Sequence, residues 1–299
     1  MTQTRHFLTL ADYSREEILS LVNRAAELKN GLPGKGKPLP LEGRSVGMIF
    51  EKPSTRTRVS FDVGVQQLGG HAIFLNWSDI QIGRGEPIRD TARVLSRYLD
   101  AIVIRTYGHN ILIEFAKWST VPIINGLSDL LHPCQVVGDL LTLQEAGVNI
   151  CTMKAAWIGD GNNVANSWID AAKILGFKLT LACPRGYDPD ADCSTDNVTL
   201  LRDPAEAMRG ADVVSTDVWA SMGQEDEIRD RRQAFKTYQV DSNLLKFASE
   251  NVYVLHCLPA HRGEEITDEV IESEHSLVWN QAENRLHVQK AILEMLVGT

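Results

Sequence analysis

The chain has 299 residues, and its 43% hydrophobic and 23% charged residues are typical of a globular protein rather than a disordered or fibrous one. This length favours two domains of ordinary size over a single core. The net charge of −9 argues against nucleic acid or an anionic membrane as the main partner, because both require a basic surface. A few arginines gathered in one place can still bind a small anion.

The cysteines and the N-terminus predict a cytoplasmic protein. The number of cysteines is odd and no Cys-x-x-Cys pair occurs, which suits reduced thiols better than a disulfide framework. The first residues lack the basic and then apolar pattern of a signal peptide, and no apolar run reaches membrane-spanning length. The five cysteines are Cys134, Cys151, Cys183, Cys193 and Cys257.

Short apolar runs alternate with amphipathic segments along the whole chain, which predicts parallel strands covered by helices on both faces. Two such series predict an α/β protein with two doubly wound parallel-sheet domains that face a cleft and are joined by interdomain helices. We expect domains at 1–133 and 134–283, with the helix 284–299 packed back on the first. The apolar runs are 46–50, 72–75, 101–104, 121–124, 155–158, 179–182, 213–215, 253–255 and 277–279, and helical patterns cover 58–68, 89–98, 111–118, 134–146 and 284–297.

Polar clusters follow the predicted strands. Parallel sheets bind ligands at the carboxyl ends of their strands, so six clusters at such ends predict a binding site in the cleft. The clusters are 51–58, 105–109, 132–135, 159–163, 217–223 and 256–259.

The sharpest local signal is the run Ser-Thr-Arg-Thr-Arg at 54–58. Hydroxyl residues open a helix here, so backbone N–H groups and the positive end of the helix dipole face the loop. Arg56 or Arg58 can add a forked grip on phosphate oxygens. The plainer alternative is a helix cap with solvated arginines, but two arginines and three hydroxyls at one strand end favour anion binding. The run is not a Walker loop, since Gly-x-x-x-x-Gly-Lys is absent.

Three further residues are candidates for a site that takes a phosphorylated carbonyl compound. Arg105 and His132 can donate hydrogen bonds to an oxygen that gains negative charge in a tetrahedral intermediate. His132 alone is more often a structural histidine. Its candidacy depends on Gln135 and the arginine run sharing the same place.

The segment Gly159-x-Gly161 resembles a dinucleotide fingerprint only weakly. The third glycine is missing, and the next strand ends at Ala182 and Cys183 rather than at an acidic residue that binds ribose. The preferred interpretation is a tight turn between strand and helix that leaves Asn162 and Asn163 at the cleft.

The segment after residue 255 places His256 next to Cys257. Neighbouring strand residues point to opposite faces, so His256 is a poor base for Cys257 and a Cys-His hydrolase is disfavoured. A metal site of His256 and His261 is also disfavoured, because no third ligand has recognisable spacing. Asp217 is a candidate for holding a cationic amine, although many aspartates at such positions only cap a turn.

Together these clusters resemble the aspartate/ornithine carbamoyltransferase family over nearly the whole chain. The motifs follow the family's order: Ser-Thr-Arg-Thr-Arg, Asp-Thr-Ala-Arg-Val-Leu (90–95), Arg-Thr-Tyr-Gly-His, His-Pro-Cys-Gln, Asp-Val-Trp-Ala-Ser-Met-Gly and His-Cys-Leu-Pro. Ser-Met-Gly and His-Cys-Leu-Pro resemble the branch that uses ornithine as acceptor. The resemblance implies transfer of the carbamoyl group of carbamoyl phosphate to the δ-amine of ornithine, in arginine metabolism, without cofactor or metal.

The resemblance also implies roles for individual residues. It implies at least a trimer, in which Gln81 reaches into a neighbouring subunit's site. The residues implied to bind carbamoyl phosphate are Ser54, Thr55, Arg56, Thr57, Gln81, Arg105, His132, Pro133, Cys134, Gln135, Cys257, Leu258 and Arg285. Those implied to bind ornithine are Asn163, Asp217, Ser221 and Met222, and the catalytic set is Arg105, His132, Thr57 and Cys257.

Three alternatives remain from the sequence. The nearest is a sister carbamoyltransferase that acts on putrescine, N-acetylornithine or aspartate. Further away are a nicotinamide-dependent oxidoreductase, suggested by Gly159-x-Gly161, and a metabolite-binding protein without activity.

Overall fold

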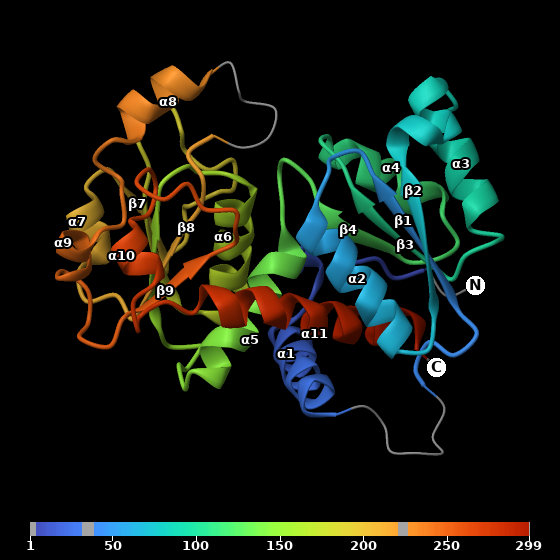
Figure 1. Ribbon diagram of the computed structural model, residues 1–299, viewed down its shortest axis with the longest axis horizontal. Coiled ribbons are helices and arrows are strands. Elements are labelled where there is room, and N and C mark those ends of the chain that lie inside the picture. Colours follow the sequence, from blue (N-terminus) through green and yellow to red (C-terminus); the bar gives the residue numbers. More distant parts are fainter. Residues whose placement is uncertain (1–3, 32–38, 221–226, 299) are drawn as a thin grey trace. The chain divides into compact units, whose positions relative to one another are not determined.

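The computed structural model describes residues 4–31, 39–220 and 227–298. The chain divides into two compact units, Met1–Leu141 with Asn284–Thr299, and Thr142–Glu283. The first is called unit 1 and the second unit 2. The chain crosses from one to the other within α5 (Pro133–Glu145) and again within α11 (Val278–Val297) (Figure 1).

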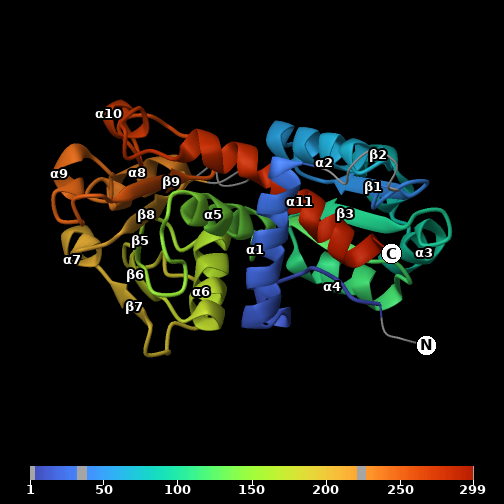
Figure 2. The ribbon, with the colours of Figure 1, turned by 90° about the horizontal axis from the view of Figure 1, so that it is seen from below.

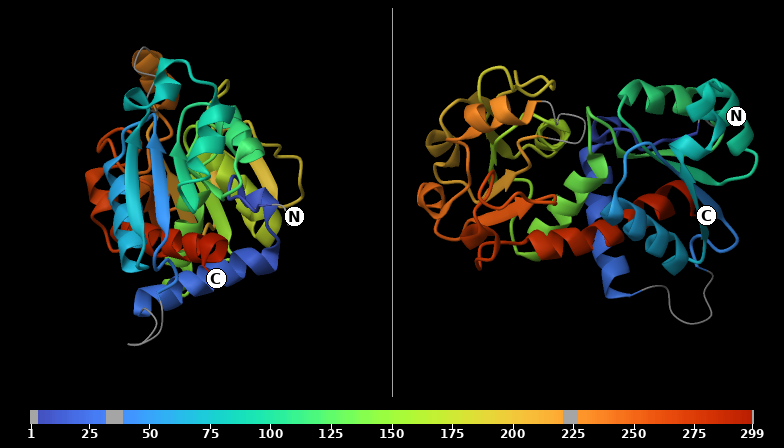
Figure 3. Two further views of the ribbon diagram at one scale, coloured as in Figure 1. Left: turned by 90° about the vertical axis from the view of Figure 1, so that its right-hand side faces the viewer. Right: turned by 45° about the horizontal axis from the view of Figure 1, so that its top comes forward.

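Unit 1 is built on a four-stranded parallel sheet of order β2-β1-β3-β4. β1 and β2 run side by side in the left view of Figure 3. β1 and β3 are almost wholly buried, which explains their unbroken apolar sequence. The elements of this unit are α1 (Arg15–Asn30), β1 (Ser45–Phe50), α2 (Thr55–Gln67), β2 (His71–Asn76), η3 (Gln81–Arg84), α3 (Ile88–Leu95), β3 (Ala101–Arg105), α4 (His109–Trp118) and β4 (Ile123–Leu127).

The helices of unit 1 lie on both faces of its sheet. The connection through α2 runs from β1 toward one edge and the connection through α4 runs from β3 toward the other, so right-handed crossovers place these helices on opposite faces (Figure 2). α11 packs against α2, since a Cβ on Gly64 would meet side-chain atoms of Leu286 and Lys290 at 3.5 and 3.4 Å. The buried Lys290 ammonium donates to the Leu28 carbonyl and to Gln67, each at 3.0 Å, and thereby ties α11 to α1 and α2.

Unit 2 is built on a five-stranded parallel sheet of order β7-β6-β5-β8-β9. α6 and α7 cover opposite faces of it (Figure 2). Its elements are β5 (Lys154–Ile158), α6 (Asn163–Leu175), β6 (Lys178–Ala182), β7 (Val198–Leu201), α7 (Pro204–Met208), β8 (Val213–Thr216), α8 (Ile228–Phe235), α9 (Ser242–Leu245), β9 (Tyr253–His256) and α10 (Asp268–Ile271).

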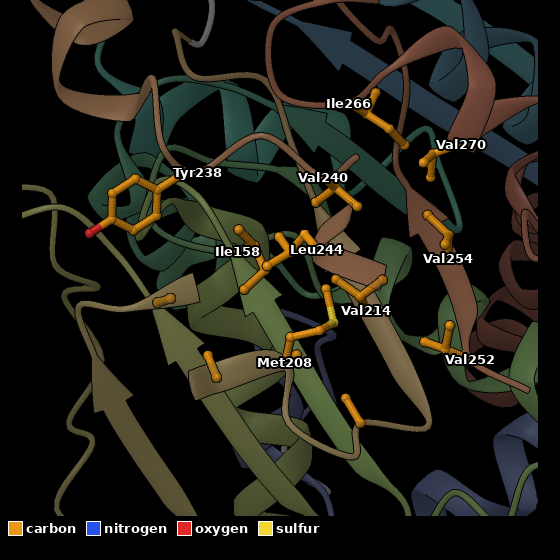
Figure 4. Packing of buried hydrophobic residues seen from close by; sticks show 14 of the residues in the cluster. Ile158, Met208, Val214, Tyr238, Val240, Leu244, Val252, Val254, Ile266 and Val270 are labelled. Carbon is orange, nitrogen blue, oxygen red and sulfur yellow. The ribbon is translucent and has the colours of Figure 1, made fainter. Parts of the chain in front are cut away.

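One face of the unit 2 sheet carries a large apolar core. Ile158, Val214 and Val254 come from three neighbouring strands and gather with Met208 and Leu244 from the covering helices (Figure 4). This close packing fixes the strand ends from which the polar loops begin.

The predicted fold class, two α/β domains with parallel sheets, is confirmed. The strand predicted at 277–279 is wrong: Ser276 forms an isolated bridge with Val254, and α11 begins at Val278. β7 was not predicted. Among the described residues, no helix is long and apolar enough to cross a membrane.

Candidate functional site

The loops after β1 and β3 begin side by side at one end of the unit 1 sheet. Phe50 pairs with Arg105 in the parallel ladder, and the Glu51 N–H donates to the Arg105 carbonyl at 2.8 Å. From these two strands the chain continues toward opposite edges of the sheet. Such a topological switch point leaves a crevice outside the strand ends, where open α/β sheets bind their ligands.

The helix α2 starts at this switch point and presents its N-terminus there. Ser54 is the N-cap residue, and its hydroxyl accepts a hydrogen bond from the Thr57 N–H at 3.2 Å. The side chain of Arg56 is partly exposed, whereas the Arg58 guanidinium lies over the Phe74 ring, 3.6 Å from its centroid. Arg56 is therefore the arginine of this run that is available for an anion.

Two more arginines are buried in the same unit. Arg105 ends β3 and is only 8% exposed. Arg285 of α11 is 4% exposed and donates to the Thr57 hydroxyl at 2.7 Å. Thus α11 brings a positive charge to the first turn of α2, although the two residues are 228 positions apart in the sequence.

His132 lies buried just before α5. Burial, together with the positive charges of Arg285 and Arg105, lowers its pKa well below the usual 6.5. At pH 7 its imidazole is therefore uncharged and carries one N–H donor.

Gln135 is fully buried and oriented by a neighbour on the same helix. Its amide nitrogen donates to the Asp139 carboxylate at 2.9 Å. Its amide oxygen has no hydrogen-bond partner among the described residues. A buried acceptor of this kind suits a ligand that carries an N–H group.

The loops of unit 1 are braced by two residues of the segment between β1 and α2. Glu51 accepts hydrogen bonds from the Thr106 hydroxyl and from the Tyr107 N–H, the latter at 3.0 Å. The Lys52 ammonium pairs with Asp129 and lies 4.1 Å from the centroid of the Tyr107 ring. These contacts hold the loop after β3 against the start of α2.

Four other residues that the sequence assigned to carbamoyl phosphate lie in varied surroundings. Thr55 is exposed in the first turn of α2, and Gln81 is exposed at the start of η3. Pro133 is buried at the start of α5. The Cys134 thiol donates to the Asn125 carbonyl at 3.3 Å, and burial raises the pKa of this thiol to about 12, so its side chain serves the fold.

Unit 2 has its own switch point, between β5 and β8. Asn162 follows β5 and caps α6, since its side-chain oxygen accepts from the Val164 and Ala165 N–H groups. Its side-chain nitrogen donates to the Asp217 carboxylate at 2.7 Å. Asn162 therefore joins the two loops of the switch point, and Asn163 occupies the first turn of α6 with a partly buried side chain.

Asp217 is the acidic centre of this second site. One oxygen accepts from Asn162, and the other accepts from the Cys257 thiol at 3.0 Å and from the Val218 N–H at 2.8 Å. Asp217 as a whole is only 7% exposed. The structure thus brings together Asp217 and Cys257, which the sequence had assigned to different parts of the site, and Leu258 follows directly in the chain.

The turn after β5 leaves no room for a dinucleotide at its second glycine. A Cβ on Gly161 would lie 2.2 Å from the Pro189 nitrogen and 2.4 Å from the Asp188 carbonyl carbon. Gly161 is therefore needed for packing against its own chain, which supports the preferred interpretation of a structural turn.

Ligand atoms of Asp217, His256 and Cys257 lie within 4.8 Å of one another, as a metal site would require. Both ring nitrogens of His256 are nevertheless engaged, one with the Leu258 N–H at 2.9 Å and one with Glu265 at 3.0 Å. Coordination would have to break one of these buried hydrogen bonds.

The structure thus gathers most of the predicted residues at two switch points, one in each unit. Sequence reasoning missed the bracing residues Glu51 and Lys52, and it missed Glu265, which contacts His256. The cap preference for Asn at the start of a helix could have marked Asn162 and Asn163 as the start of α6, but it does not distinguish between the two. The predicted ornithine residues Ser221 and Met222 lie outside the described residues.

Comparisons with known proteins agree with this arrangement. Residues 5–145 match the family model for the aspartate/ornithine carbamoyltransferase carbamoyl-P binding domain, and residues 152–296 match the model for the Asp/Orn binding domain.

Relatives that match this chain along nearly their whole length are named ornithine carbamoyltransferase. An ornithine carbamoyltransferase of Geobacter metallireducens is 56% identical and covers 98% of this chain and 99% of its own length. An anabolic ornithine carbamoyltransferase of Pseudomonas aeruginosa is 54% identical and covers 98% and 97%. The solved structure of ornithine carbamoyltransferase from Pyrococcus furiosus superimposes with a TM-score of 0.91, at 50% identity, and covers 98% and 97%. The chain belongs to the aspartate/ornithine carbamoyltransferase family.

Proposed function

We propose that this protein transfers the carbamoyl group of carbamoyl phosphate to the δ-amine of L-ornithine, giving L-citrulline and phosphate. The proposal depends above all on the cationic switch point of unit 1, where Arg285 contacts the first turn of α2 close to Arg105 and His132. The acidic switch point of unit 2 supplies the complementary chemistry for an amino-acid acceptor. We assign the reaction to arginine synthesis, as the word anabolic in the name of the Pseudomonas relative suggests.

The phosphate of carbamoyl phosphate binds at the N-terminus of α2. Ser54, Thr55 and Thr57 supply hydroxyl and backbone donors there, and Arg56 supplies a forked positive charge. Arg105 is shared between the phosphate and the carbonyl oxygen. Arg285 completes the positive surroundings through its contact with Thr57.

Two buried side chains form hydrogen bonds with the carbamoyl group. An uncharged His132 donates its N–H to the carbonyl oxygen, which gains negative charge during attack. The free amide oxygen of Gln135 accepts from the carbamoyl nitrogen, because Asp139 already fixes the amide nitrogen of Gln135. Pro133 and Cys134 contribute through the backbone of the same turn.

Ornithine binds at the switch point of unit 2. Asp217 pairs with its α-amine, and Asn163, Ser221 and Met222 complete the amino-acid end. Cys257 and Leu258 lie beside the side-chain amine and the carbamoyl group. The proposal divides the chain into two domains. The domain of residues 1–133, together with 284–299, binds carbamoyl phosphate, and the domain of residues 134–283 binds ornithine.

The reaction is a direct attack without a covalent enzyme intermediate. Ornithine reacts as its neutral δ-amine, and the lone pair on nitrogen attacks the carbonyl carbon. Thr57, Arg105 and His132 stabilise the resulting oxyanion. As that oxyanion collapses, the bond from the carbonyl carbon to the phosphate oxygen breaks, phosphate leaves, and the attacking nitrogen gives up one proton to the departing phosphate or to water. Fixed positive charge and proximity supply most of the rate acceleration.

The proposal includes a homotrimer, or a multiple of trimers, in which the exposed Gln81 reaches a neighbouring site. It also places the enzyme in the cytoplasm, where thiols such as Cys257 stay reduced.

The test is an assay of the full chain with carbamoyl phosphate and four acceptors in parallel: ornithine, putrescine, N-acetylornithine and aspartate. We expect carbamoyl transfer to ornithine and no comparable transfer to the others. Arg56→Ala should abolish turnover while the protein stays folded, because the phosphate loses its forked partner. Arg58→Ala is the matched control, since Arg58 lies over Phe74 instead.

Each outcome bears on a different part of the proposal. Preference for another amine would retain the carbamoyl phosphate site and replace the acceptor. Near-normal activity of Arg56→Ala would contradict the assignment of the phosphate to α2. Transfer to none of the four amines would contradict the proposed reaction.

A further inference from the structure

The backbone directly after β9 adopts an unusual conformation at Leu258. This leucine has a φ of 56°, and it is the only non-glycine with positive φ in the part of the chain that the structure describes. A left-handed conformation is unfavourable for a side chain of this kind, so surrounding contacts must enforce it. The residue before it, Cys257, is the one whose thiol contacts Asp217 at 3.0 Å.

The ring of His256 supplies one of these contacts. Its Nδ1 accepts a hydrogen bond from the Leu258 N–H at 2.9 Å. A backbone amide can only donate, so Nδ1 must present its lone pair and Nε2 must carry the ring proton. Nε2 therefore donates to the Glu265 carboxylate, 3.0 Å away.

Glu265 links the two ends of the loop 257–260. The oxygen that accepts from His256 also accepts from the His261 N–H at 2.6 Å. One carboxylate oxygen thus fastens the residue before the loop 257–260 and the residue after it. His256 is held in addition through its own N–H, which donates to Gln281 at 2.9 Å.

The arrangement fits a positioning role better than a chemical one. His256 is 1% exposed and Glu265 is fully buried, so neither side chain is accessible to a substrate. Both ring nitrogens of His256 are engaged with the protein, which leaves no proton acceptor for general-base catalysis.

We infer that the His256–Glu265 pair is a positioning device that sets the left-handed conformation of Leu258 and thereby aims the Cys257 thiol and the adjoining peptide groups at the acceptor site. The inference rests on the proposed function, because the exact position of the loop 257–260 matters only if this loop contributes to the acceptor site. Small displacements of positioned groups are costly in catalysis, because a misplacement of about 1 Å can lower the rate about 100-fold.

Four variants of the full chain separate the parts of this device. Glu265→Ala removes the shared acceptor, whereas Glu265→Gln retains an oxygen for both donors and removes only the charge. His256→Asn keeps an acceptor close to the position of Nδ1 but loses the contact with Glu265. His261→Asn is the control, because its side chain is exposed and its backbone N–H is unchanged.

The measurements are kcat and KM for ornithine, the Kd for inorganic phosphate and the Tm of each variant. We expect Glu265→Ala to lower kcat by about 10- to 100-fold, as a displacement of the loop of up to about 1 Å would do. Glu265→Gln should restore most of the activity, and His256→Asn should lie between these two. The Kd for phosphate should not change, because phosphate binds in unit 1.

The outcomes are distinct for the two proposals. If the parent produces citrulline and Glu265→Ala turns over as fast as His261→Asn, the positioning role is overturned and the proposed function stands. A Glu265→Ala variant that loses phosphate affinity in parallel with kcat would indicate a general structural defect and would also overturn it. If Glu265→Ala does not fold, equal activity of His256→Asn and the parent overturns it. A parent without carbamoyl transfer removes the proposed function and this inference with it.

Discussion

At the scale of single residues, the two units use the same position of a helix for opposite electrostatic purposes. Ser54 and Asn162 each cap the helix that follows the first strand of their unit. The Ser54 hydroxyl caps α2 and brings no charge of its own, so the arginines near the N-terminus of α2 determine the positive charge there. Asn162 has a second polar atom, which binds the carboxylate of Asp217 and keeps it at the start of α6. One cap therefore favours an anionic ligand, and the other holds a fixed anion for a cationic ligand.

Asp217→Asn should weaken the use of ornithine far more than the binding of phosphate. The change removes the charge that pairs with the α-amine but nearly preserves the shape of the side chain. A charge-assisted hydrogen bond contributes about 1.5–3 kcal/mol, so kcat/KM for ornithine should fall by roughly 10- to 100-fold. Steady-state kinetics with ornithine and calorimetric titration with inorganic phosphate measure the two effects separately.

Asp203→Asn is the control for this substitution. Asp203 caps α7 through the Ala205 N–H, and asparagine caps helices equally well. Equal loss of ornithine use and phosphate binding in Asp217→Asn would count against its proposed role.

The residues that carry charge at strand ends could be predicted from the sequence, whereas their partners could not. Arg56, Arg105 and Asp217 stand out because polar residues directly follow apolar strands. The contact of Arg285 with Thr57 depends on how α11 packs on α2, which no local pattern encodes. Whether Asn162 or Asn163 is the cap depends on the exact residue at which α6 begins, and the sequence does not locate a helix end to one residue.

At the scale of elements, apolar runs located the buried strands well and failed where a strand was short or half-exposed. β7 has one buried, one exposed and two partly exposed residues, and this weak pattern escaped prediction. The run at 277–279 has the composition of a strand, but it forms only an isolated bridge before α11 begins. In this bridge the Val254 N–H donates to the His275 carbonyl at 2.8 Å, and the Leu277 N–H donates to the Val254 carbonyl at 3.0 Å. Apolar runs of three residues do not distinguish a strand from the first turn of a buried helix.

The loop after β5 is also joined to α8, through a buried ion pair with a predictable pH dependence. Arg231 contacts the Asp160 carboxylate at 3.1 Å and donates to the Trp219 carbonyl at 2.9 Å. Burial raises the pKa of Asp160 from 3.8 to about 6, against the opposing effect of Arg231. Between these two values the folded chain binds more protons at Asp160 than the unfolded chain, so this stabilising contribution is lost as the pH rises through about 6.

We therefore expect the Tm advantage of the parent over Asp160→Asn to shrink as the pH rises from 5 to 7. The loss over this range corresponds to roughly 1 kcal/mol, because only about one pH unit of it lies below the folded-state pKa of about 6 and each unit contributes about 1.36 kcal/mol. Thermal unfolding of both proteins across this range measures it. Asp188→Asn is the control, because its pairing with Arg202 lowers the pKa of Asp188 and moves its titration below this window. A Tm difference for Asp160→Asn that stays constant with pH would show that Asp160 does not titrate there.

At the scale of the whole molecule, both units follow one principle, since each carries its functional side chains at the switch point of a parallel sheet. In each unit the strands form a packed core that supports these loops. The loops of unit 1 carry positive charge, whereas those of unit 2 carry the negative charge of Asp217. The proposed trimer extends this arrangement, because in it the exposed side chain of Gln81 acts at a site on a neighbouring chain.

Mixing two inactive variants tests whether Gln81 acts in a neighbouring subunit. Gln81→Ala and Arg56→Ala should each be inactive as pure proteins, because each removes one part of every site. In a mixed trimer with cyclic symmetry, a Gln81→Ala subunit retains Arg56 and can receive Gln81 from an Arg56→Ala neighbour. Random assortment of equal amounts into trimers should then restore about a quarter of the sites.

The measurement is citrulline formation after the two variants are unfolded together and refolded, with the molecular mass determined by light scattering. Refolding each variant alone is the control, since it should restore no activity. Restoration near a quarter of the parent's activity, at the mass of a trimer or its multiple, requires a site shared between neighbours. If refolded mixtures stay inactive although trimers form, Gln81 acts within its own chain or not at all. If the protein is a monomer, Gln81 does not act in a neighbouring subunit.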